Sequence, residues 1–139
     1  LVAADEVLLP IQCEYYALEG VTQLMRTIEA VRHAMNKELR LGSILMTMFD
    51  GRTRLSTQVD EEVRTHFARE TMSTRIPRSV RVSEAPSYSR SVLTYEPTSA
   101  GAVAYREAAA EFAKRHACDE HSTNTSGVKH PDASDTKKG

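Results

Sequence analysis

The sequence predicts an α/β fold: half of a doubly wound, mostly parallel sheet with flanking helices. Short apolar runs of strand length alternate with segments whose apolar residues recur at helical spacing. This alternation is typical of right-handed βαβ units with parallel strands. Of the 139 residues, 40% are hydrophobic, which is enough for one core. Three or four strands and three helices are few for a complete sheet of this kind, so we expect one half of a larger sheet.

The first predicted strand and helix occupy the amino-terminal quarter of the chain. Residues 7–11 are a continuous apolar run and predict a buried strand, with Pro10 near its end because proline cannot donate to the ladder. Residues 12–20 form a connection or a first helical turn. From residue 21 to about 36 the apolar residues follow a helical period. This stripe consists of Val21, Leu24, Met25, Ile28, Val31 and Met35.

A second strand and helix follow. Residues 43–49 are apolar enough for a second buried strand, and Asp50-Gly51 marks a turn. Thr57 with Asp60 three residues later resembles a capping box, so we expect the second helix to begin there and to end near residue 68. Its apolar residues recur every four positions: Val59, Val63 and Phe67.

The remaining elements are shorter, except for the last helix. Residues 72–76 predict a third strand, and residues 78–91 have the composition of turns. Residues 92–95 predict a brief fourth strand. Ser99 can cap a final helix that we expect to continue to residue 116.

The composition divides the chain into a domain and a tail. Residues 1–116 carry the periodic segments, whereas residues 117–139 are almost entirely polar and predict a disordered tail. The chain begins at Leu1 rather than Met, on an apolar segment, which indicates the middle of a longer protein.

Charge, hydropathy and cysteine usage exclude several classes of protein. With 18 basic and 19 acidic residues, the net charge of −1 excludes a globally basic nucleic-acid binder but leaves room for a local patch. No apolar run is long enough for a transmembrane helix. Cys13 and Cys118 lie far apart and match no metal or redox spacing, and the histidines match no standard metal site. A reduced, cytoplasmic setting follows from the cysteines.

Arginines gather where the predicted strands end. Arg52 and Arg54 follow the second strand, and Arg78, Arg81 and Arg90 follow the third. Ligands of doubly wound folds bind beyond the carboxyl ends of the strands, so these loops can form one patch suited to phosphate, in a nucleotide or in a nucleic-acid backbone. The alternative is that they are solvated surface arginines paired with nearby acids such as Asp50 and Glu84.

Three segments resemble the ParA (Soj-like) partition ATPases, in that family's order and spacing. They are residues 5–20 (DEVLLPIQCEYYALEG), 47–55 (TMFDGRTRL) and 76–88 (IPRSVRVSEAPSY). The resemblance extends over about residues 1–116. It implies a P-loop NTPase fold with a deviant Walker A motif, related to MinD. It further implies ATP and Mg²⁺ as ligands, ATP-dependent homodimers, nonspecific DNA binding, a ParB-like partner, no membrane association and a cytoplasmic, nucleoid-associated location.

The phosphate-binding part of such an ATPase is missing from the sequence. A P-loop needs a glycine followed by lysine, and none of the six glycines is followed by lysine. The resemblance is therefore to the carboxyl-terminal half of a ParA protein. We expect this half to have no catalytic activity alone and not to bind ATP and Mg²⁺ productively.

The resemblance also implies roles for three sets of residues. The adenine side of the nucleotide pocket corresponds to Thr47, Met48, Pro77, Arg78 and Ser79. The DNA-contacting arginines correspond to Arg52 and Arg81, assisted by Arg54. The dimer or partner contact corresponds to Glu14, Tyr15 and Tyr16. For each set the alternative is a structural role: a strand end or turn, a solvated arginine, or local packing.

Two other functions stay open on the sequence. The chain can be a free-standing module that binds DNA or a partner and modulates a full-length ParA protein. It can also be a nucleotide-binding fragment of a MinD-like protein. The cargo, chromosome or plasmid, is not determined by these residues.

Overall fold

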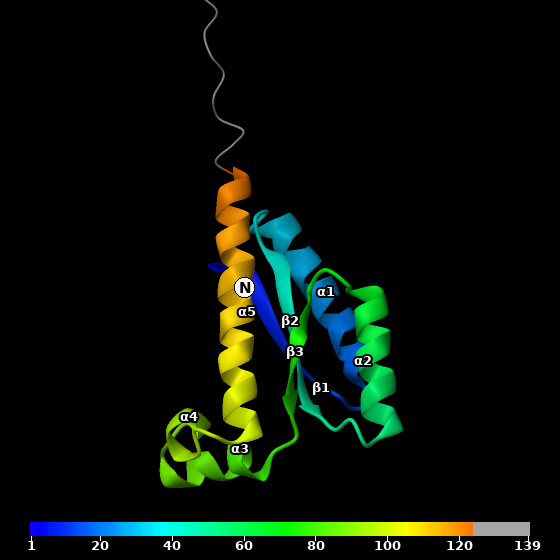
Figure 1. Cartoon of the computed structure of the whole chain (residues 1–139). Coiled ribbons are helices and arrows are strands. Elements are labelled where there is room, and N and C mark those ends of the chain that lie inside the picture. Colours follow the sequence, from blue (N-terminus) through cyan, green and yellow to red (C-terminus); the bar gives the residue numbers. More distant parts are fainter. Residues whose placement is uncertain (124–139) are drawn as a thin grey trace, which may run out of the picture.

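Three parallel strands form one sheet in the computed structural model, which describes residues 1–123 (Figure 1). The strands are β1 (Glu6–Gln12), β2 (Arg40–Phe49) and β3 (Thr71–Pro77), in the order β1-β2-β3. Each predicted strand of residues 7–11, 43–49 and 72–76 lies within one of them. The α/β class with a parallel sheet is therefore confirmed.

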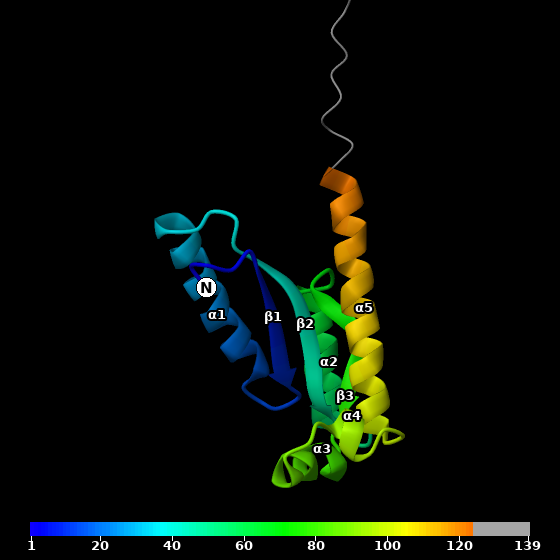
Figure 2. The same cartoon turned by 90° about the vertical axis from the view of Figure 1, so that its left-hand side faces the viewer.

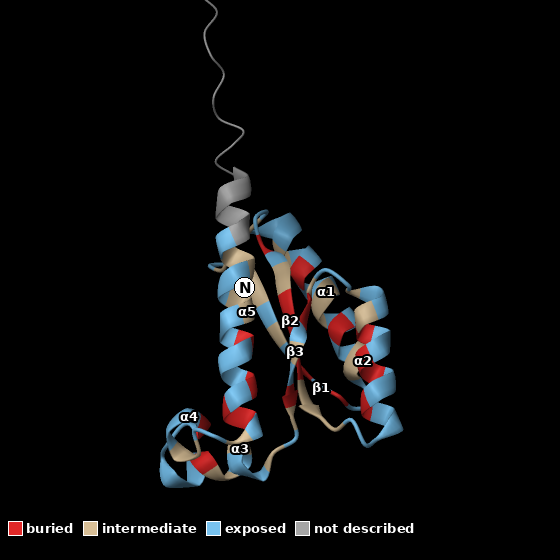
Figure 3. Cartoon of the chain, in the orientation of Figure 1, coloured by how far each residue is buried: buried red, intermediate tan, exposed pale blue. Residues whose placement is uncertain are grey.

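Helices cover both faces of the sheet (Figures 1 and 2). Helices α1 (Ala17–Ala34) and α2 (Arg54–His66) lie on one face, and α5 (Ala100–Thr123) lies on the other, mainly against β3. The buried residues line the surfaces where helices meet the sheet (Figure 3). The core under α1 and α2 consists of Ile11, Cys13, Val21, Ile44, Met46, Val59 and Val63. The core under α5 consists of Leu45, Met72, Ile76, Ala104 and Ala108.

The central strand β2 contributes to both cores. Ile44 and Met46 face α1 and α2, whereas Leu45 faces α5. Because successive side chains of a strand point to opposite faces, a strand buried on both sides must be apolar at consecutive positions. This explains why residues 43–49 form a continuous apolar run rather than an alternating one.

The N-cap of helix α2 lies four residues earlier than the sequence predicted. This N-cap is Thr53, whose hydroxyl accepts a hydrogen bond from the Ser56 N–H at 3.3 Å. The predicted capping box of Thr57 and Asp60 is wrong. Thr57 instead donates its hydroxyl to the Thr53 carbonyl, and Asp60 is a buried member of an ion-pair cluster. Either threonine suits an N-cap, and the N–H and hydroxyl of Thr53 both donate to the Asp50 carbonyl at 3.0 Å, which holds Thr53 at the end of the Asp50-Gly51 turn.

Three short helices occupy the region predicted as turns and a fourth strand. They are α3 (Val80–Glu84), η1 (Ala85–Tyr88) and α4 (Val92–Tyr95). The predicted strand 92–95 is therefore wrong. Val92 and Ala85 pack against Ala102 of α5, which gives this segment a small core of its own. A four-residue apolar run cannot be assigned to a strand or a helix from periodicity alone.

Helix α5 continues to Thr123, past residue 116, where the sequence predicted the helix to end and the tail to follow. The rest of the predicted tail lies outside the described residues. Within residues 1–123, the helices fall short of the length and apolar character needed to cross a membrane.

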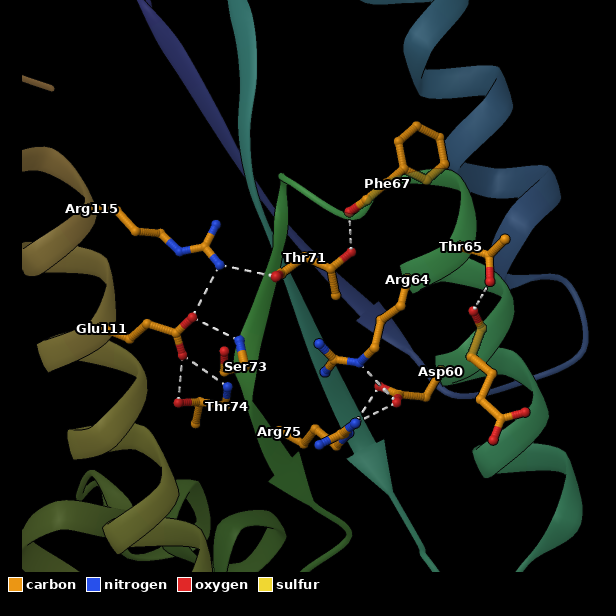
Figure 4. Close-up of polar contacts among 11 residues, drawn as sticks. Asp60, Arg64, Thr65, Phe67, Thr71, Ser73, Thr74, Arg75, Glu111 and Arg115 are labelled. Carbon is orange, nitrogen blue, oxygen red and sulfur yellow. Dashed lines mark hydrogen bonds and ion pairs between the residues drawn. The ribbon is translucent and has the colours of Figure 1, made fainter. Parts of the chain in front are cut away.

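Two carboxylates, the buried Asp60 and the half-buried Glu111, attach the helices to β3 (Figure 4). Asp60 of α2 accepts hydrogen bonds from Arg64 at 2.9 Å and from Arg75 of β3 at 2.6 Å. Glu111 of α5 accepts from the backbone N–H groups of Ser73 and Thr74 at 2.7 and 2.8 Å and from Arg115. Each face of the sheet thus has one charged anchor on the edge strand β3.

The environment of Glu111 lowers its pKa. Burial raises the pKa, but hydrogen bonds from the Ser73 N–H, from the hydroxyl and N–H of Thr74 and from Arg115 outweigh it and bring it from 4.5 to about 2. A depressed folded-state pKa means that the ionised Glu111 stabilises the fold fully above about pH 4.5. That stabilisation is lost as the pH falls toward 2.

The substitution Glu111→Gln tests this anchor. We expect it to lower the free energy of unfolding by on the order of 3 kcal/mol at pH 7, and by about half as much at pH 3. Urea unfolding followed by circular dichroism at both pH values measures the difference. Glu107→Gln, at an exposed position one turn earlier on α5, is the matched control. An equal loss of stability at the two pH values would contradict the account.

Candidate functional site

The carboxyl ends of the three strands are held together by hydrogen bonds. The Cys13 N–H donates to the Thr47 carbonyl at 3.1 Å, and the Thr47 hydroxyl donates to the Ile11 carbonyl at 3.0 Å. The Arg78 N–H donates to the Phe49 carbonyl at 2.9 Å. These bonds bring the loops after β1, β2 and β3 to one edge of the sheet, where doubly wound folds bind their ligands.

Four of the five predicted adenine-side residues share one hollow. Thr47, Met48, Pro77 and Ser79 line a cavity of about 250 Å³ on the α5 side of the sheet, together with Tyr105. The sequence did not single out Tyr105, because its helical spacing on α5 resembles that of a core residue. Arg78, the fifth predicted residue, lines a different cavity.

The backbone conformation of Met48 is unusual for a residue other than glycine. Its φ angle is +54°, in the left-handed region that side chains with a Cβ disfavour. The pairing of β2 with β3 shifts register between Met46 and Phe49, so the strand bends at this point. Strained residues cluster at ligand sites, where surrounding contacts hold them.

The predicted dimer or partner residues line the larger cavity, on the opposite face of the sheet. This cavity measures about 880 Å³ and includes Glu14, Tyr15 and Tyr16 as well as Arg78 and Cys13. Tyr15 and Tyr16 are 78% and 72% exposed, and their rings pack edge to face with centroids 5.1 Å apart. Arg78 lies 3.7 Å from Glu14. The cavity is thus apolar inside with exposed aromatic rings and an ion pair at its margin.

Cys13 is a structural residue of this cavity. Burial raises the pKa of its thiol to about 11, with a further contribution from Asp60. At neutral pH the thiol is therefore protonated and is a poor nucleophile and metal ligand. This agrees with the interpretation of Cys13 as a small core residue. No group of three His, Cys, Asp or Glu side chains within residues 1–123 could hold a metal ion.

The predicted DNA-contacting arginines are placed on two elements. Arg52 precedes α2 and lines a hollow of about 380 Å³ with Arg54 and Glu61. Arg81 lies on α3, which packs beside α4 and α5 (Figure 2). The structure brings Arg52 and Arg54 together in this hollow, and Arg81 lies apart from them.

Both principal arginines have a carboxylate partner in their own turn. Arg52 donates from Nε and from Nη2 to the two carboxylate oxygens of Asp50, at 3.0 Å each. Arg81 donates from Nη1 to Glu84 at 3.1 Å. Hydrogen bonds from the Arg52 side chain and backbone lower the pKa of Asp50 to about 2, so this pair stays charged at neutral pH.

Comparison with solved structures supports the class of the fold. The first 41 residues match the protein family described as an AAA domain. Cobyrinic acid a,c-diamide synthase from Mycobacterium smegmatis is 33% identical, with a TM-score of 0.58 over 94% of this chain and 43% of that protein. Its form with bound ADP and magnesium is 32% identical, with a TM-score of 0.57 over 97% and 44%. The parallel sheet and this likeness define a P-loop NTPase-like α/β protein.

Sequence relatives identify the family. Chromosome-partitioning ATPase Soj of Thermus thermophilus and chromosome partitioning protein ParA of Caulobacter vibrioides are each 50% identical over 115 residues, 83% of this chain. The sporulation initiation inhibitor protein Soj of Bacillus subtilis is 47% identical over 113 residues. The chain belongs to the ParA/Soj family. It spans 46%, 43% and 45% of the length of these three relatives, which is less than half.

Proposed function

We propose that this chain works as the carboxyl-terminal half of a ParA-type partition ATPase. The observation that carries the proposal is 50% identity to Soj and ParA over 83% of the chain. The proposed half contributes the adenine side of the nucleotide pocket, a dimer surface and a nonspecific DNA-binding surface. A ParB-like partner and a place on the nucleoid in the cytoplasm follow from the same proposal.

The exposed edge of the sheet supports a role as half of a larger domain. In the described part of the chain β1 has a neighbour on one side only, and Leu8 on β1 is 43% exposed. A parallel edge strand with exposed apolar residues is prone to pair with another strand. The amino-terminal half of a partition ATPase is the partner that we propose for this edge.

The residues present fit only one part of an ATP site. The hollow lined by Thr47, Met48 and Pro77 suits an apolar ring with polar atoms, as adenine is. The phosphates and Mg²⁺ need a glycine-rich loop, a lysine and carboxylates, and within residues 1–123 no acidic or histidine cluster suits a metal ion. The chain alone therefore does not fit the triphosphate group, and no hydrolytic step is assigned to its residues.

The DNA surface is the second part of the proposal. Arg52 and Arg81, with Arg54, follow strands whose ends meet at one edge, and Arg52 is 90% exposed. Arginine contacts to phosphate give affinity without sequence preference. Glu14, Tyr15 and Tyr16 form the proposed dimer or partner surface, because exposed aromatic residues are enriched at protein interfaces.

A free-standing binding module is the alternative function. It is favoured by the same exposed arginines and tyrosines in a chain without a phosphate-binding loop. Such a module would act on DNA or on a full-length ParA protein, and it would keep its surface properties without ATP. A nucleotide-binding fragment of a MinD-like protein is the third possible function. Such a fragment would bind adenine nucleotide but not DNA.

The isolated 139-residue chain should not hydrolyse ATP. Phosphate release is expected at the rate of a protein-free blank, because phosphoryl transfer depends on phosphate and metal contacts that its residues do not supply. Adding a separately produced amino-terminal half of Thermus thermophilus Soj is the positive control. ATP hydrolysis that co-purifies with the isolated chain at constant specific activity would disprove the proposal that the phosphate-binding part of the site lies in the other half.

Replacing Arg52 and Arg81 with alanine should weaken binding to all duplexes alike. Each substitution should reduce the slope of log K against log salt by roughly one unit, because one phosphate contact is lost. The free energy of unfolding should change by no more than about 0.5 kcal/mol at these surface positions.

The measurement is a salt titration of duplex binding by the chain joined to the amino-terminal half of a Soj relative, with ATP. Arg26→Ala, at an exposed position on α1 away from the strand ends, is the matched control. An unchanged affinity and slope in the double variant would show that Arg52 and Arg81 are ordinary solvated residues.

A further inference from the structure

Each of the two principal arginines of the proposed DNA surface forms an ion pair with a carboxylate from its own turn. Asp50 binds Arg52 through both of its oxygens, and its Oδ1 also accepts the Arg52 backbone N–H at 3.1 Å. Glu84 binds Arg81 three residues earlier on α3. These acids are therefore held against the arginines by local chain geometry, not by chance encounters between flexible side chains.

We propose that Asp50 and Glu84 are internal competitors for DNA phosphate, which hold Arg52 and Arg81 in ion pairs that must open for the arginines to bind DNA fully. The inference rests on the proposed DNA-binding function and adds the residues that set its strength. It predicts that the two carboxylates keep nonspecific binding weaker and less dependent on salt than the arginines alone would make it.

The geometry of the Arg52 pair explains the competition. A guanidinium group binds phosphate best through two parallel N–H bonds along one edge. Asp50 already takes the edge formed by Nε and Nη2. A phosphate therefore has two ways to bind Arg52. It can bind the remaining edge of a guanidinium whose charge Asp50 already neutralises, or it can displace Asp50.

The exposure of the arginines makes displacement feasible. The Arg52 side chain is 90% exposed, and the Arg81 side chain is 55% exposed. Ion pairs that involve an exposed side chain are weak, because water and salt compete for both charges. DNA can therefore open these pairs, and the expected effect of each carboxylate on affinity is several-fold rather than orders of magnitude.

A positioning role would have the opposite sign. If Asp50 served to aim Arg52 at DNA, removing its charge would let the arginine wander and would weaken binding. If Asp50 competes with DNA, removing its charge strengthens binding. The direction of a single measurement therefore separates the two roles.

The test uses Asp50→Asn and Glu84→Gln in the 139-residue chain and in the same chain joined to the amino-terminal half of Thermus thermophilus Soj. Asparagine keeps the Oδ1 acceptor for the Arg52 backbone N–H, so the turn before α2 is retained. Fluorescence anisotropy with short duplexes of unrelated sequence gives the affinity at several salt concentrations, and circular dichroism checks that each variant is folded.

Each substitution should tighten binding about two- to fivefold at low salt and make the salt dependence steeper. Glu61→Gln is the control for a general change in charge. Glu61 lines the same hollow as Arg52 and Arg54, but among the described residues its carboxylate has no ion pair. It should have a smaller effect than Asp50→Asn. In an Arg52→Ala background the gain from Asp50→Asn should disappear.

Three results would overturn the inference, and they are distinguishable from one another. If Arg52→Ala weakens binding while Asp50→Asn leaves it unchanged or weakens it, the DNA surface stands and the competition is disproved. If Asp50→Asn tightens DNA binding as much in the Arg52→Ala variant as in the unmodified protein, the effect comes from the general change in charge and not from competition for Arg52. If Arg52→Ala and Arg81→Ala leave binding unchanged, the proposed DNA surface itself fails, and the competition fails with it.

Discussion

The rest of the structure depends on the parallel pairing of β1, β2 and β3. Parallel strands point their carboxyl ends to the same edge of the sheet, so loops that are far apart in the sequence become neighbours. The backbone bonds from Cys13 to Thr47 and from Arg78 to Phe49 fix this edge directly. Because β2 is buried on both faces, its register cannot slip without moving apolar side chains into the wrong layer.

Carboxylates at the boundary between helices and sheet place the helices relative to that sheet. Asp60 links α2 to β3, and Glu111 links α5 to the backbone of β3. Glu6 on β1 links this strand to α5 through His116 at 2.8 Å, and to β2 through Arg40 at 3.1 Å. The side chain of Glu6 crosses Gly42, and a Cβ on Gly42 would collide with it. The contacts of Glu6 lie at the amino ends of β1 and β2, away from the carboxyl ends of the strands.

The sequence predicted the regular elements because their apolar residues follow a clear period. The strands at 7–11, 43–49 and 72–76 and the helices that follow the first two strands are of this kind. It failed where the choice depends on contacts between distant residues. The helical conformation of residues 92–95 depends on packing against Ala102, and the start of α2 depends on a turn that favours Thr53 over Thr57.

In the candidate site, too, some features could be predicted from the sequence and others could not. The gathering of the strand-end loops could be predicted, since it follows from topology alone. Thr47, Met48, Pro77 and Ser79 line one hollow, and their role on the adenine side stays a prediction. The left-handed conformation of Met48, the contribution of Tyr105 and the separation of Arg78 from that hollow depend on three-dimensional packing, which a linear pattern does not specify.

We propose that this chain supplies one half of a nucleotide-dependent DNA-binding domain. The most direct test joins it to the amino-terminal half of Thermus thermophilus Soj and measures duplex binding with and without ATP, beside each half alone. We expect the joined protein to bind duplex DNA in an ATP-dependent way, and we expect no dependence on ATP in either half alone. Equal binding by the isolated chain, with or without ATP, would contradict the claim and favour a free-standing binding module.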